Sequence, residues 1–199
     1  MEDKVKFSEN VILIDVAFLN DIACNVRTFF GARLGRELPQ LDLPAWLSYL
    51  ALDAGLREGD NEIQVLLMHD DDTGNLTCCV PSELDKLNGM ACRTPLGEFQ
   101  FASVSVAGMV SCEELYLDLM NLALDSADVK VLMLVPFHPS YGDRIGEALH
   151  KFFDGKSKEE CNKAIFFAME KPAKPLPCTW DFVIFSLARA FGIKSDELQ

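Results

Sequence analysis

Short apolar runs separated by amphipathic segments form the pattern of hydrophobic positions along this chain. Residues 11–14 read VILI, and residues 129–137 hold a second, almost wholly apolar run, as in strands buried on both faces. Residues 99–106 alternate phenylalanine or valine with smaller or polar side chains, which is typical of a strand with one buried face. The pattern predicts strands at 11–15, 62–68, 99–106, 129–136 and 164–169.

Apolar residues at helical spacing lie between these strands. Asp42 precedes Leu43 and Pro44, an arrangement that suits a helix N-cap and first turn. Ser111 and Glu114 form a capping box, S-x-x-E, that opens a further helix. The predicted helices cover 18–34, 42–56, 82–87, the stretch after Ser111, 143–153 and 179–191.

Strands that alternate with helices favour parallel crossovers, which place helices on both faces of a sheet. The sequence therefore predicts an α/β fold, a three-layer α/β/α sandwich around a mostly parallel sheet. The strands at 11–15 and 129–136 are apolar throughout, so we expect them to be parallel neighbours near its centre. The 199 residues fit one domain, 1–199, whose final helix at about 179–191 follows a proline-rich linker at 171–177.

The charge balance limits the classes of partner. Eighteen basic residues against thirty-one acidic residues give a formal net charge of −13. Nucleic-acid binders normally carry a basic patch, because Lys and Arg release counterions from phosphates. The basic residues here are scattered, with small groups only at 27–36 and 151–163. RNA is therefore a possible but disfavoured partner, and an unidentified protein partner is preferred.

Several features favour a cytoplasmic protein without a membrane segment. The N-terminal residues are charged and lead directly into a strand, unlike a signal peptide, and the apolar runs are too short to span a bilayer. The seven cysteines contain no CxxC pair, so we interpret them as buried small hydrophobic residues.

Acidic residues follow the predicted strands. Asp15 closes the first strand, residues 70–72 close the second, and Asp118 lies one turn into the helix after the third. In parallel sheets, ligands bind at the carboxyl ends of the strands, and Mg²⁺ or Mn²⁺ takes oxygen ligands such as carboxylates. Strand-end aspartates also commonly serve as helix caps or turn residues, so a structural role stands beside the metal-binding role.

The segment 12–20, ILIDVAFLN, resembles the opening of NYN domains of the PIN-like nuclease superfamily, an apolar strand followed by I-D-G-x-N. Residues 112–137 resemble that family's central run, in which an acidic residue enters a helix that leads to a buried strand. The resemblance implies a PIN/NYN-like fold and metal-dependent ribonuclease chemistry. It places Asp15 and Asp118 as catalytic metal ligands and Asn20 as a substrate-binding residue.

The chain departs from that family after the fourth strand. The family carries S-G-D-S-D-F there, whereas this sequence reads VPFHPSYGD, with His138, Ser140 and Tyr141 in place of acids. The nearest acid is Asp143, which is the candidate third ligand for Mg²⁺ or Mn²⁺. His138 and Arg144 are candidate substrate-binding residues in the same loop. Because carboxylates are replaced here, at least one metal ligand is expected to be missing.

Two functions remain from the sequence. The first is a catalytically degenerate PIN/NYN-like domain that works as a binding or regulatory module, and the second is a metal-dependent ribonuclease. The substituted loop and the charge of −13 favour the first. The absence of GxGxxG, GxxxxGK[ST] and GxSxG motifs disfavours dinucleotide, P-loop and serine-hydrolase sites. His69 and His138 both follow strands, so a shared cleft for the two is a weaker possibility.

Overall fold

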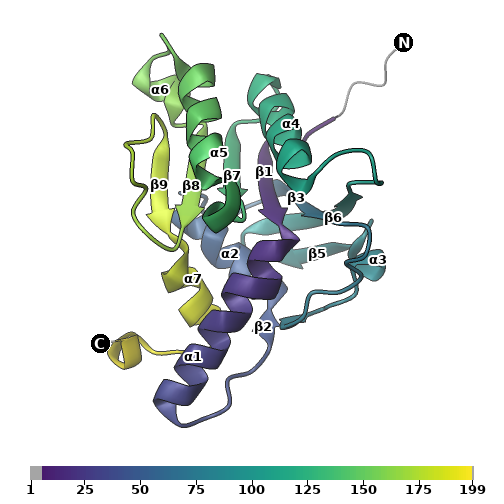
Figure 1. The fold of residues 1–199 in the computed structure, drawn as a ribbon, viewed down its shortest axis with the longest axis vertical. Helices are drawn as coiled ribbons and strands as arrows, with labels where there is room; N and C mark the ends of the chain where they lie inside the picture. The colour runs from purple at the N-terminus through teal and green to yellow at the C-terminus, as the bar shows by residue number, and fades with distance from the viewer. Residues whose placement is uncertain (1–5, 199) are drawn as a thin grey trace.

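A seven-stranded sheet forms the centre of the computed structural model, which describes residues 6–198 (Figure 1). The strand order is β5-β6-β3-β1-β7-β8-β9, so β1 lies in the middle. Neighbouring strands are parallel except β5 and β6. The strands are β1 (Asn10–Asp15), β3 (Asn61–His69), β5 (Ala91–Thr94), β6 (Gly97–Ser105), β7 (Val131–Val135), β8 (Ala164–Ala168) and β9 (Thr179–Phe182); β2 (Leu41–Asp42) and β4 (Cys79–Val80) pair separately.

Helices cover both faces of this sheet. The helices α4 and α5 pack over one face, and η1, α1, α2 and α7 contribute to the core on the other (Figure 1). Among residues 6–198, no helix is both long and apolar enough to cross a bilayer. The helices are η1 (Phe18–Ala23, a π-helix), α1 (Cys24–Leu34), α2 (Leu43–Asp53), α3 (Leu84–Leu87), α4 (Cys112–Asp125), α5 (His138–Phe153), α6 (Lys158–Cys161), α7 (Val183–Ala190) and η2 (Ser195–Leu198, a 3₁₀ helix).

Alternation along β1 explains why both faces are covered. Val11 and Leu13 pack into the core beneath α4 and α5, whereas Ile12 and Ile14 pack into the core on the opposite face. All four side chains are completely buried. A fully apolar strand suits this position, because successive side chains point to opposite faces. The α/β fold with a mostly parallel sheet, predicted from these runs, is confirmed.

The order of the central strands brings three chain segments to one edge. β1 pairs in parallel with β7 on one side and with β3 on the other. The expectation that the strands at 11–15 and 129–136 are parallel neighbours is therefore correct. Because the three strands run in the same direction, Asp15, His69 and the residues after Val135 all come to the carboxyl edge of the sheet.

The C-terminal segment differs from the prediction of a helix from Thr179. Residues Thr179–Phe182 form β9, the outermost parallel strand, and helix α7 begins only at Val183. Trp180 and Phe182 share one face of β9, and their rings lie 5.0 Å apart. Pairing with β8 gives these half-buried aromatic residues a surface to pack on, which outweighs the helical preference predicted from residue 179 onward.

Helix α5 also begins earlier than predicted. It starts at His138, five residues before the expected start at Asp143, and Pro139 lies in its first turn, where a missing N–H costs nothing. Tyr141 departs from helical geometry, with φ −135° and ψ 18°. The segment expected to be a site loop is therefore a distorted first turn of a helix.

Candidate carboxyl-edge site

A cavity of about 270 Å³ opens at the carboxyl edge of the sheet, where β1 and β3 end. We call it the carboxyl-edge cavity. The start of η1 and the first residue of α4 complete its walls. Its polar lining comes mainly from Asp15, Asn20, Asp21, His69, Asp70 and Cys112.

Asp15 lies at the end of β1 and is only 2% exposed. Its Oδ2 accepts a hydrogen bond of 2.5 Å from the Tyr141 hydroxyl, and its Oδ1 accepts one of 2.8 Å from the Ala17 N–H. Burial raises the pKa of Asp15 and the nearby Asp70 carboxylate adds to this rise, whereas both hydrogen bonds oppose it. Each oxygen of this carboxylate is therefore bound within the protein.

Asp70 forms the second carboxylate of the cavity. It is exposed, and its Oδ1 accepts a hydrogen bond of 3.0 Å from the Cys112 thiol at the start of α4. Burial, together with the contact with Asp70, raises the pKa of Cys112 to about 12, so this thiol stays protonated and is a poor nucleophile. His69 contacts the Asp70 carbonyl through Nδ1 and the Ser103 hydroxyl through Nε2, both at 2.7 Å.

Two further polar side chains hold the loops around the cavity. Asn20 donates to the Asn75 carbonyl at 3.0 Å and accepts from the Thr77 N–H at 2.7 Å, which ties η1 to the turn after β3. Asp71 accepts from the Ser105 hydroxyl and, at 2.9 Å, from the Ala107 N–H, which joins the loops after β3 and β6. Asn20, a predicted substrate ligand, therefore has both ends of its amide bound to backbone.

Asp118 does not come to Asp15. It lies two residues after Tyr116, whose buried hydroxyl donates to the Leu13 carbonyl at 3.0 Å. Two residues span about 200° around a helix, so Asp118 points away from the sheet and is exposed. It does not line the carboxyl-edge cavity. The expectation that Asp15 and Asp118 share a cation is corrected, because the buried face of α4 is set by Tyr116 and Met120.

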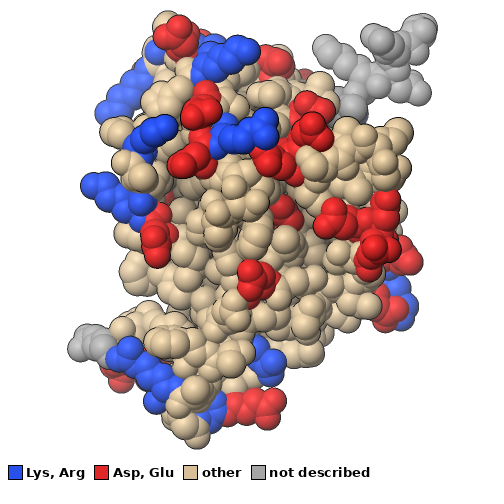
Figure 2. Space-filling view, in the orientation of Figure 1, with Lys and Arg blue, Asp and Glu red and all other residues tan. Residues whose placement is uncertain are grey.

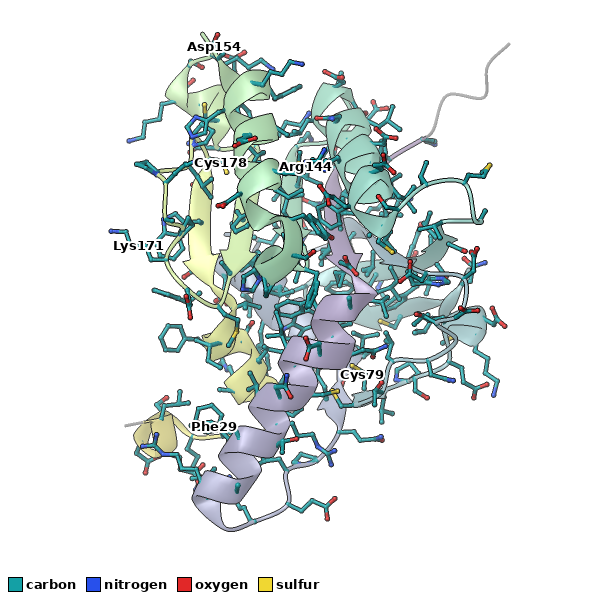
Figure 3. The ribbon with its side chains drawn as sticks, in the orientation of Figure 1. Phe29, Cys79, Arg144, Asp154, Lys171 and Cys178 are labelled. Carbon is teal, nitrogen blue, oxygen red and sulfur yellow. The ribbon has the colours of Figure 1, made fainter. Side chains whose placement is uncertain are left out.

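Arg144 forms an ion pair that joins α5 to α4. It lies on the side of α5 that faces α4 (Figure 3), where its guanidinium pairs with Glu113. The arginine side chain is 61% exposed and the glutamate side chain 26% exposed. Arg144 therefore links two helices rather than reaching into the carboxyl-edge cavity.

His138 and Asp143 line a different cavity from Asp15. Both belong to the side of α5 that faces the segment after β8. His69 lines the carboxyl-edge cavity instead, so the two histidines do not share a cleft. The early start of α5 explains this. Residues 138–143 form its first turn, in which Tyr141 is buried in the core while His138 and Asp143 line the cavity beside the segment after β8.

The predicted metal ligands do not fit a shared Mg²⁺ or Mn²⁺ site. Asp15, Asp118 and Asp143 lie in separate surroundings, and both oxygens of Asp15 already accept hydrogen bonds. Within residues 6–198, no group of three or more His, Cys, Asp or Glu side chains is arranged to hold a metal ion. A hard cation needs several oxygen ligands, and the exposed carboxylates among the lining residues of the carboxyl-edge cavity are those of Asp70 and Asp21.

Tyr141 is a neighbour of Asp15 to which the sequence pattern alone assigned no role. It is 4% exposed and packs in the core beneath α5 with Ile145, Leu149 and Phe153. The i, i+4, i+8 and i+12 spacing of these residues is the signal that could have placed Tyr141 toward the sheet. Its ring lies 5.7 Å from that of Tyr116, so two buried tyrosines pack side by side near the end of β1.

Charged groups are unevenly distributed over the surface. On the face shown in Figure 2, Lys and Arg gather at the upper left and at the lower end, separated by a broad area with few charges. Acidic side chains gather at the right of this view. This face therefore lacks, within the described residues, the continuous basic stripe that a polyanion needs.

Comparison with known proteins gives one match. No curated protein and no solved structure matches the chain. A model of a family of unknown function, DUF6621, matches residues 4–198, which is almost the whole chain. The protein therefore belongs to the DUF6621 family.

Proposed function

We propose that this protein is a catalytically degenerate PIN/NYN-like domain that works as a binding or regulatory module for a protein partner. One observation carries the proposal: both oxygens of Asp15 accept hydrogen bonds from the protein itself, one of them from the buried Tyr141 hydroxyl. In the resembling nucleases this strand-end aspartate is a metal ligand. Here the same group holds the start of α5 against the end of β1.

The electrostatics of the edge support a non-catalytic role. Phosphoryl transfer needs positioned positive charge to stabilise the charge that develops in the transition state. The carboxyl-edge cavity has Asp15, Asp21 and Asp70 but no Lys or Arg in its lining. The net charge of −13 also slows the approach of a polyanion.

The second candidate is a metal-dependent ribonuclease, and one observation favours it. Asp15 and Asp70 line the same cavity at the carboxyl ends of adjacent parallel strands, which is where such a site would lie. A cation that displaced the Tyr141 hydroxyl from Asp15 would have the carboxylates of Asp15, Asp21 and Asp70 within this cavity. The two candidates therefore differ in whether the hydrogen bond from the Tyr141 hydroxyl to the Asp15 carboxylate is replaced by a bound cation.

A cleavage assay separates these candidates. Purified protein is incubated with single-stranded RNA in Mn²⁺, beside an Asp15→Asn variant whose folding is verified by circular dichroism. We expect the same background cleavage from both proteins. Cleavage by the wild type that disappears in the variant would establish the ribonuclease and overturn the proposal.

Charge reversal at the carboxyl-edge cavity tests the proposed binding role. Asp21→Lys reverses an exposed charge of the carboxyl-edge cavity, and Asp154→Lys is the matched control at the far end of α5 (Figure 3). A protein partner retained by the wild type and by the control should be lost by Asp21→Lys. Retention that is equal for all three proteins would contradict a partner site at this edge.

A further inference from the structure

A second cavity, of about 280 Å³, lies between α5 and the segment after β8. We call it the α5 cavity. It shares no lining residue with the carboxyl-edge cavity. Lys171, in the segment that forms its outer wall, lies on the side of α5 away from α4 (Figure 3).

Contacts near the end of α5 hold the outer wall in place. His150 Nε2 donates to the Pro175 carbonyl at 2.8 Å, and Lys174 pairs with Glu147 at 3.8 Å. Leu176 packs directly on Gly146, where an added Cβ would come within 3.2 Å of the leucine side chain. The segment is therefore closely packed against the second half of α5.

The floor of the α5 cavity is apolar. Phe166 and Ala168 of β8 form it, and Leu176 and Pro172 add apolar surface from the outer wall. Phe166 and Ala168 are 4% and 3% exposed, so they belong to the hydrophobic core. A preformed apolar floor with a few polar groups at its rim is the usual construction of a small-molecule site.

The rim carries an excess of negative charge. Asp143 and Glu170 form no ion pair or side-chain hydrogen bond within residues 6–198, whereas Glu147 is paired with Lys174. Lys171 is the remaining cation of the lining. Three carboxylates therefore face two ammonium groups.

His138 adds no positive charge to this rim. Burial lowers the pKa of His138, although the Pro136 carbonyl and Glu170 oppose this. The Met169 N–H points to its Nε2 at 3.4 Å, which makes Nε2 an acceptor and places the proton of the neutral ring on Nδ1. His138 therefore leaves the excess of carboxylates over ammonium groups in the lining unchanged.

We propose that the α5 cavity binds a small organic cation, a protonated amine on an apolar body about the size of one ring. The apolar body lies on Phe166, Ala168 and Leu176, and the ammonium group pairs with Asp143 and Glu170 at the rim. The net charge of −13 further favours a cation over an anion. This site uses none of the residues on which the proposed function depends.

The probe for this site is 2-phenylethylamine, with neutral 2-phenylethanol and anionic 3-phenylpropionate as matched ligands. Titration of the ¹⁵N-labelled full chain, followed by NMR, should show saturable shifts at Gly142, Gly146 and Ala168 with the amine. We expect the alcohol to bind about tenfold more weakly, which corresponds to the loss of one charge-assisted contact. The carboxylate should bind more weakly still.

A double variant tests the role of the rim. Asp143→Asn with Glu170→Gln changes two exposed side chains, so the fold should persist, and amine affinity should fall about tenfold. Asp154→Asn, which removes one acidic charge at the other edge of the sheet, should leave amine binding unchanged. Equal binding of amine and alcohol, shifts that map elsewhere, or full affinity in the double variant would each overturn the proposal.

Discussion

Asp15 lies at the end of the central strand with 2% of its surface exposed, and it accepts hydrogen bonds from Tyr141 and Ala17. A carboxylate in this position would be costly to bury without such donors. Tyr116, beside Tyr141, donates in the same region to the neutral Leu13 carbonyl. The two tyrosines therefore allow the contact with the carboxylate to be compared with a contact to an uncharged group.

Replacement of Tyr141 with Phe should lower the free energy of unfolding at pH 7 by about 1.5–3 kcal/mol, because it removes a donor from a buried carboxylate. The matched variant Tyr116→Phe should cost less, about 0.5–1.5 kcal/mol, because its acceptor is neutral. Urea unfolding of the three proteins measures both values. A smaller loss for Tyr141→Phe than for Tyr116→Phe would show that Asp15 does not depend on this hydroxyl.

The raised pKa of Asp15 predicts a dependence of stability on pH. Its ordinary value is 3.8, and burial raises the value in the folded state. The folded protein therefore holds this proton more tightly than the unfolded chain, and this contribution to stability is present below pH 3.8 and is lost as pH rises through the raised pKa. The Asp15→Asn variant has no ionisable side chain at this position, so its stability should not decrease for this reason as pH rises.

The wild type and Asp15→Asn should therefore differ in free energy of unfolding by an amount that depends on pH. This difference, wild type minus variant, should be larger near pH 4 than at pH 7, because only the wild type is destabilised by ionisation of this group. Urea unfolding of both proteins across this pH range measures it. A constant difference, or one that grows toward pH 7, would contradict the raised pKa.

At the level of single elements, the hairpin between β5 and β6 depends on close backbone contact. Gly97 begins β6 with φ +138°, and an added Cβ would lie 2.1 Å from the Asn61 carbonyl oxygen of β3. Gly89, before β5, also has a positive φ, +80°, but a Cβ there would meet no atom within 4 Å. A side chain would strain the backbone at either position, but only at Gly97 would it also lack space.

Gly89→Ala should therefore cost about 1 kcal/mol, from backbone strain alone. Gly97→Ala should cost clearly more, at least about 2 kcal/mol, because β3 and β6 must also move apart. Chemical denaturation of both variants gives the comparison. Equal losses of unfolding free energy at the two positions would mean that β3 and β6 accommodate the added methyl group without further cost.

The elements show what the sequence can specify. The apolar runs at β1 and β7 predict their central, parallel position because only a strand buried on both faces needs them. Strand β9 has four residues with mixed polarity, so its sequence carries no such signal, and it forms because β8 offers an edge to pair with. Capping by Asp42 and the capping box of Ser111 and Glu114 were predicted correctly, because these contacts are local.

The site was less predictable than the fold. Asp15 could be placed at the carboxyl edge from the sequence, but its partner Tyr141 comes from 126 residues further along the chain. Asp118 was misplaced because a helix turns about 100° per residue, so the orientation of α4 decides which side chains meet the sheet. The buried spacing of Tyr116, Met120 and Ala123 shows that orientation.

For the whole molecule, the charge of −13 and the separate surroundings of Asp15, Asp118 and Asp143 favour binding over phosphoryl transfer. A catalytic cation would have to replace the Tyr141 hydroxyl on Asp15 and recruit Asp70 from the next strand. Binding of a divalent cation through Asp15 is therefore the property that most clearly separates the two candidate functions.

Calorimetric titration of Mn²⁺ into the wild-type protein and into Asp15→Asn measures this property directly. Because the Asp15 oxygens are held by Tyr141 and Ala17, we predict no saturable heat that depends on Asp15, so the two titrations should coincide. A one-site isotherm in the wild type that vanishes in Asp15→Asn would show that this carboxylate is a metal ligand, and it would contradict the proposed non-catalytic role.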